Sequence, residues 1–135
     1  MSAEDSATHR IPLTVGLEAS VTEEVRFERT IASYDGKLPP VWATPTMIGL
    51  MEVAAARAVQ PALAPGQLTV GTEIHVRHLK AVMLGAQVTA HARLTAIGDR
   101  FLTFDVEAKN GEEVVGKGQV MRAIVDFNRF VARLA

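Results

Sequence analysis

One stretch decides the fold of this chain: Thr44-Pro-Thr-Met-Ile-Gly-Leu-Met-Glu-Val-Ala-Ala-Ala-Arg-Ala-Val-Gln60. Apolar side chains recur there at nearly every position around a helical wheel, and a helix that is apolar on almost all sides is a buried helix. Thr44 suits the N-cap and Pro45 the first helical position, while Pro61 interrupts the pattern. We therefore predict a buried helix from Thr44 to about Gln60.

Downstream of this helix the hydrophobic pattern changes to a period of two, which is typical of β-strands. It predicts four strands, over residues 67–78, 86–97, 102–109 and 113–127, with a tight turn at Gly98-Asp99 and a two-residue hairpin at Asn110-Gly111. The side chains predicted to face inward in the first two of these strands are Leu68, Val70, Thr72, Ile74, Val76 and His78, then Val88, Ala90, Ala92, Leu94 and Ala96.

The hydrophobic pattern before the predicted helix is less regular. Residues 17–22 alternate as in a short strand, residues 23–34 fit either a helix or an extended chain, and residues 35–40 form a loop rich in Gly and Pro. Residues 1–14 are polar and unpatterned, so we expect a flexible N-terminal arm followed by one domain over residues 15–135. A short helix is expected at the C-terminal end.

A nearly all-apolar helix next to an antiparallel series of strands predicts an α+β domain. In the expected architecture, the antiparallel sheet wraps around a long buried central helix, which is the hot-dog fold. Such a sheet leaves an edge strand that is usually covered by a second copy. We therefore expect a homodimer, and a tetramer stays open.

Charge and cysteine content exclude several classes of protein. The chain has 14 Lys+Arg and 15 Asp+Glu, for a net charge of −1, which argues against nucleic-acid and anionic-membrane binding. It contains no cysteine, which excludes thiol catalysis, disulfides and Cys-based zinc sites. No apolar run approaches the roughly 20 residues of a membrane span, and the N-terminal segment lacks a signal-peptide profile. We expect a cytoplasmic protein without a catalytic metal.

Glu52 is the most informative candidate for chemistry. Its helical neighbours three and four positions away cannot pair with a carboxylate, and burial of an unpaired carboxylate is costly. A structural explanation is an exposed position or an ion pair with Arg57 or Arg122. The functional explanation is a general base or nucleophile in a pocket. The pattern alone leaves both open.

Four other positions have a structural and a functional interpretation. His78 lies where the alternation predicts Val or Leu, so it is either a core histidine or an acid/base. Thr44 is an N-cap, or it lies beside a helix N-terminus that binds an oxyanion or phosphate. Gly71 marks a bulge or the close approach of a ligand. Arg122 pairs with a buried carboxylate or faces a polyanionic ligand.

Two segments resemble the hot-dog thioesterases related to fluoroacetyl-CoA thioesterase: Val41-Trp-Ala-Thr-Pro-Thr-Met-Ile-Gly-Leu-Met-Glu52 and Gly71-Thr-Glu-Ile-His-Val-Arg-His78. The likeness extends from Val41 to the C-terminus. It implies that Thr44, Glu52 and His78 form the catalytic group. It also implies that Gly71 lies near the thioester carbonyl, that Arg122 belongs to the active-site region, and that a homodimer has its sites at the subunit interface.

The function implied by this resemblance is hydrolysis of a small acyl-CoA thioester, with CoA as part of the substrate and no separate cofactor. Glu52 would attack the carbonyl or activate water, Thr44 would orient Glu52, and His78 would act as acid/base. The segment Tyr34–Pro40 is shorter than the aromatic lid segment of the fluoroacetyl enzyme, so no acyl group is implied. The alternatives are a non-catalytic acyl-CoA or hydrophobic-ligand binding dimer and, last, a dehydratase.

Overall fold

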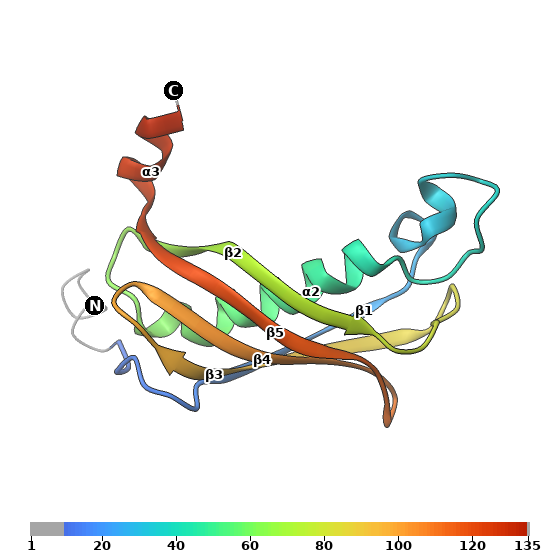
Figure 1. Ribbon diagram of the computed structural model, residues 1–135, viewed down its shortest axis with the longest axis horizontal. Coiled ribbons are helices and arrows are strands. Elements are labelled where there is room, and N and C mark those ends of the chain that lie inside the picture. Colours follow the sequence, from blue (N-terminus) through green and yellow to red (C-terminus); the bar gives the residue numbers. More distant parts are fainter. Residues whose placement is uncertain (1–9, 135) are drawn as a thin grey trace, which may run out of the picture.

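The computed structural model describes residues 10–134 and shows a five-stranded antiparallel sheet packed against one main helix (Figure 1). The strand order in the sheet is β1-β3-β4-β5-β2, so β1 and β2 are the edge strands. The strands are β1 (Glu18–Glu24), β2 (Gln67–His78), β3 (Gln87–Ile97), β4 (Phe101–Asn110) and β5 (Glu113–Asp126), and the helices are α2 (Thr44–Val59) and α3 (Phe127–Leu134). The predicted α+β class with an antiparallel sheet is confirmed.

The core lies between one face of α2 and the sheet, and α2 contacts all five strands. The buried side chains of this helix are Met47, Leu50, Met51, Ala54, Ala55, Ala58 and Val59. On the opposite face Gly49 and Arg57 are exposed, and Val53 is 39% exposed to solvent. The expected burial on nearly all sides therefore holds only for the sheet-facing side of the single chain.

The start of α2 differs from the sequence-based expectation. Ala43 is the N-cap, in an extended conformation at φ −73° and ψ 139°, and its carbonyl accepts hydrogen bonds from the backbone N–H groups of Thr46 and Met47. Thr44 is the first helical residue and makes no capping hydrogen bond. The predicted N-cap role of Thr44 is therefore wrong, because its hydroxyl is engaged elsewhere. At the other end the chain tightens into a short 3-10 helix, Gln60–Ala62.

The predicted inward-facing residues of β3 are buried as far as Leu94, where a bulge begins. Val88, Ala90, Ala92 and Leu94 are fully buried, as predicted. The pairing of β3 with β4 shifts register between Leu94 and Ala96. An extra residue in one strand reverses the alternation beyond it, so Ala96 is exposed and its predicted inward position is wrong.

A second bulge, in β2, reverses the faces of that strand. The pairing of β2 with β5 shifts register between Gly71 and Glu73. Before the bulge Thr69 is buried, whereas Val70 and Thr72 line a cleft on the opposite face of the sheet. The predicted inward position is therefore wrong for Val70 and Thr72, and by alternation for Leu68. Beyond the bulge Val76 and His78 face α2 as predicted, because a bulge adds one residue to the count.

The predicted hairpin and C-terminal helix are confirmed. Gly111 has φ +63° in the turn between β4 and β5, a conformation that glycine adopts without steric cost. Upstream, the chain is extended to Glu24 and then forms two short 3-10 helices, Phe27–Arg29 and Ile31–Ser33. No helix within residues 10–134 is both long and apolar enough to cross a membrane.

The predicted N-terminal arm is only partly covered by the structure. Residues 1–9 lie outside the described residues. In the remainder of the arm Leu13 packs against the core, and the Ile11 N–H donates to the Pro61 carbonyl at 3.3 Å.

The β3 bulge gives the first testable prediction. Leu94→Ala should lower the free energy of unfolding by about 3 kcal/mol, because it leaves a cavity in the core. Ala96→Ser, two residues further on, should change it by less than about 0.5 kcal/mol, because that side chain is exposed. Urea unfolding of both variants measures the difference. A large loss in Ala96→Ser would contradict the bulge.

Candidate active site

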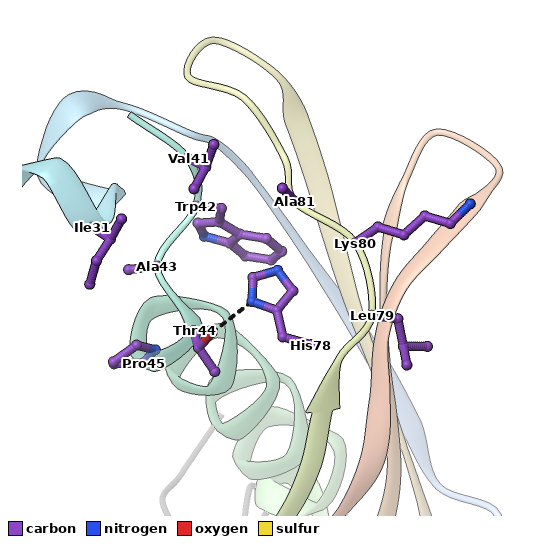
Figure 2. A pocket seen from close by; sticks show the side chains of 10 residues that line it. All are labelled: Ile31, Val41, Trp42, Ala43, Thr44, Pro45, His78, Leu79, Lys80 and Ala81. Atoms are coloured by element: carbon purple, nitrogen blue, oxygen red, sulfur yellow. Dashed lines mark hydrogen bonds between the residues drawn. The ribbon is translucent and has the colours of Figure 1, made fainter. Parts of the chain in front are cut away.

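A cavity of about 350 Å³ opens at the N-terminal end of α2 (Figure 2). Its walls come from the segment that precedes α2, from the end of β2 and from the loop after β2. The residues that line it are Ile31, Val41, Trp42, Ala43, Thr44, Pro45, His78, Leu79, Lys80 and Ala81. Two of the predicted site residues, Thr44 and His78, therefore share one pocket.

The His78 imidazole is held on two sides. A hydrogen bond of 2.8 Å joins Thr44 Oγ1 and His78 Nδ1. The Trp42 indole, which is almost fully buried, meets the imidazole edge-on, with ring centroids 6.2 Å apart and an interplanar angle of 86°. The remaining nitrogen, Nε2 of His78, is buried and has no hydrogen-bond partner among residues 10–134.

Burial also sets the charge of this imidazole. Desolvation by burial holds the pKa of His78 below its ordinary value of 6.5, and the nearby Lys80 backbone acts in the opposite direction with the smaller effect. His78 is therefore neutral near pH 7, the form in which an imidazole accepts a proton.

A second polar cluster lies further along α2. Arg122 on β5 donates from Nη1 to Glu52 Oε1 at 2.7 Å. It also donates from Nε to Thr69 Oγ1 and from Nη2 to the Thr69 carbonyl, each at 2.8 Å. Arg122 is only 8% exposed, so these bonds satisfy a desolvated cation. The ion pair that the sequence left open for Glu52 and Arg122 is thus present.

Gly71 lies directly against the Glu52 carboxylate. A methyl group at position 71 would come within 2.7 Å of both oxygens of Glu52, which is closer than atoms can pack. The register shift follows immediately after Gly71. The bulge expected at Gly71 is therefore present, and the group that lies against its backbone in the single chain is the Glu52 carboxylate. The close approach of a ligand stays a prediction.

The five predicted site residues thus form two clusters in the single chain. Thr44 and His78 lie at the start of α2, and Glu52, Gly71 and Arg122 lie two turns along it. Eight residues of helix separate Thr44 from Glu52, a rise of about 12 Å. Residues 10–134 contain no group of three or more His, Asp or Glu side chains arranged to hold a metal ion.

Two residues of these clusters were missed in the sequence. The alternation over residues 67–78 places Thr69 on the outer face, opposite to Leu68 and Val70, because the bulge that turns it inward leaves no trace in the sequence pattern. Trp42 carried a signal, as a large aromatic residue two positions before the helix, but nothing local indicates that it contacts His78.

Comparison with known proteins identifies the family. The model of the fluoroacetyl-CoA-specific thioesterases matches residues 25–128. A fluoroacetyl-CoA thioesterase of Streptantibioticus cattleyicolor is 39% identical over 98 residues, which cover 73% of this chain and 70% of that protein. A solved fluoroacetyl-CoA thioesterase superposes with a TM-score of 0.85 at 32% identity, over 92% of this chain and 96% of the other.

The fold is shared more widely. A hot-dog-like protein from Thermanaerovibrio acidaminovorans superposes with a TM-score of 0.81 at 20% identity, over 89% of both chains. A variant of the fluoroacetyl-CoA-specific enzyme has also been solved in complex with fluoroacetate and CoA. With a family match over most of its length and this fold, the chain belongs to the fluoroacetyl-CoA-specific thioesterase family, whose members are acyl-CoA thioester hydrolases.

Proposed function

We propose that this chain hydrolyses a small acyl-CoA thioester to the carboxylic acid and free CoA, with Thr44, Glu52 and His78 as the catalytic group. The observation that carries the proposal is the neutral His78, fixed by Thr44 and with a free Nε2, in a pocket at a helix N-terminus. CoA enters as part of the substrate and no separate cofactor takes part. The proposal also places the enzyme in the cytoplasm as a homodimer.

The distance between the two clusters favours a site built from two subunits. Residues 71–75 of the edge strand β2 are all exposed, and among them the apolar Ile74 is 37% exposed to solvent. An exposed edge of this kind pairs readily with another strand. If β2 pairs antiparallel with a second β2 so that His78 lies opposite Gly71 of the partner subunit, the pocket of one subunit adjoins Glu52 of the other. Strand spacing then brings the two clusters within reach.

The chemistry follows from these groups. Glu52 either adds to the thioester carbonyl carbon, expelling the CoA thiolate and leaving an anhydride for water to cleave, or takes a proton from the attacking water. In both routes water supplies the proton that ends on the CoA sulfur. In the first route His78 Nε2 takes it from the water that cleaves the anhydride, and in the second Glu52 takes it from the attacking water and passes it on through His78, so that Glu52 ends as a carboxylate. Backbone N–H groups at the start of α2 and near Gly71 are donors for the oxyanion.

Gly71 and Arg122 belong to the same proposal as binding-site residues. Gly71 leaves room for the carboxylate, and Arg122 fixes its direction through the hydrogen bond to Oε1. A bidentate anchor on Thr69 leaves Arg122 little freedom, so the carboxylate is held before substrate arrives. Because 28% of the Glu52 side chain remains exposed, substrate can reach it.

The size of the pocket favours a short acyl group. Its volume of about 350 Å³ is at the lower end of ligand sites. The segment before Val41 forms 3-10 turns and a loop in which Tyr34 is 64% exposed. It therefore offers no closed aromatic lid in the single chain, and the acyl group of the fluoroacetyl relatives does not extend to this protein.

A non-catalytic binding dimer is the second candidate, and Glu52→Gln separates it from the first. With a panel of short, branched and aromatic acyl-CoAs, the native protein should release thiol and Glu52→Gln should lose about 10³-fold in kcat. Glu112→Gln, in the exposed β4–β5 turn, is the matched control. Tight binding of CoA esters without thiol release by the native protein would establish the binding module instead.

The pH profile tests His78. Since burial lowers its pKa, the neutral base persists as the pH falls, and the rate loss that is due to His78 protonation should have its midpoint below pH 6.5. His91→Gln, which changes a histidine of β3 outside both clusters and away from the proposed interface, should leave the kcat/KM profile unchanged. A His78-dependent acid limb centred above pH 6.5 would contradict the proposed environment.

Mixing two inactive variants tests the composite site. In a heterodimer of Glu52→Gln and His78→Gln subunits, one of the two sites recovers both native groups. Statistical co-assembly should therefore restore about one quarter of native activity, half of the dimers having one of two sites intact. Each variant alone should stay inactive. No recovery from isolated heterodimers would place Glu52 and His78 of one site in the same subunit.

A further inference from the structure

A second cleft lies on the face of the sheet opposite α2. It has a volume of about 390 Å³ and is bounded by α3 and by the adjoining ends of β2 and β5. Figure 1 shows α3 leaving the sheet at the end of β5 and projecting beyond the strand ends. The catalytic proposal uses none of the side chains in this cleft.

The cleft concentrates positive charge in a chain whose net charge is −1. Arg100, Arg129 and Arg133 all line it, against one acidic residue, Asp126. The Asp126 carboxylate accepts the backbone N–H of Arg129 at 3.0 Å and so caps α3. Within the described part of the chain, none of the three arginines forms an ion pair within 4.0 Å, whereas Arg29, Arg93 and Arg122 each have one.

Aromatic side chains alternate with these arginines. Phe101 and Phe130 both line the cleft, and Phe101 is 42% exposed. The guanidinium carbon of Arg100 lies 5.2 Å from the centroid of the Phe101 ring. Guanidinium groups bind phosphate oxygens in a fork, and aromatic faces stack against planar bases. Together these groups fit a ligand with both phosphates and a flat ring.

We propose that this cleft binds the phosphorylated adenine nucleotide end of CoA. The inference rests on the proposed function and deepens it. In β2, Gln67 pairs with Asp126, the residue that precedes α3. In the dimer register described above, the loop after His78 of the partner subunit runs alongside residues 67–70. The loop that lines the partner's pocket would then lie beside the start of α3, and the pantetheine arm would pass around this loop, from the thioester on the α2 face of the sheet to the arginines on the outer face.

The test compares two thioesters of the same acyl group, one of CoA and one of pantetheine, which lacks the nucleotide. Arg129→Glu/Arg133→Glu should raise KM for the acyl-CoA about tenfold and leave kcat/KM for the acyl-pantetheine unchanged. Both arginines are exposed, so the fold is preserved. Arg93→Glu/Lys117→Glu makes the same charge change around another cleft of the sheet and should leave both substrates unaffected.

Calorimetry gives a readout independent of catalysis. Adenosine 3′,5′-bisphosphate and CoA should both bind the native protein and lose affinity in Arg129→Glu/Arg133→Glu, even if no thioester is hydrolysed. Equal effects on acyl-CoA and acyl-pantetheine, or no effect on either, would overturn the proposal. Loss of bisphosphate binding with an unchanged KM for acyl-CoA would show that a free nucleotide occupies the cleft, which also overturns it.

Discussion

The ion pair between Arg122 and Glu52 is the interaction on which the rest of the site depends. It joins the last strand to the middle of α2 and, through the two bonds to Thr69, to the edge strand. Arg122 is buried and Glu52 is partly exposed, so removal of Glu52 leaves an uncompensated charge in the interior, at a cost of at most about 3–5 kcal/mol. The same contact therefore fixes the helix on the sheet and aims the carboxylate. The ion pair with Arg122 that explains Glu52 structurally is thus also the contact that would orient its carboxylate for catalysis.

Local patterns predicted most of the elements. The helix from Thr44, the Asn110-Gly111 hairpin and the strands after residue 67 each follow from periodicity and turn chemistry within a short window. The faces beyond the bulges could not be predicted in this way. A bulge inserts one residue without changing composition, so Thr69 read as an outward side chain and Ala96 as an inward one. The pairing of strands distant in sequence decides both.

The candidate site was predicted residue by residue but not in its arrangement. Glu52, His78 and Arg122 are exceptions to their surroundings, a charge or an imidazole where an apolar side chain fits the pattern. Exceptions of this kind are visible in a single sequence. Their grouping into two clusters depends on the length of α2 and on which strand lies at the sheet edge. Thr44 illustrates the difference. The sequence predicts correctly that a helix starts there, but the Thr44 hydroxyl bonds His78 instead of capping the helix.

The close packing of Gly71 against Glu52 also constrains how this family can diverge. A side chain at position 71 either displaces the Glu52 carboxylate from its place beside Arg122 or needs a shorter residue at position 52, and a shorter residue at position 52 abandons the ion pair with Arg122. A substitution at position 71 is therefore harmful while Glu52 is in place, and a shorter residue at position 52 loses the ion pair whatever stands at position 71. The two positions are therefore epistatic. Descendants that acquire another acyl preference are expected to change the walls of the pocket long before they change this pair.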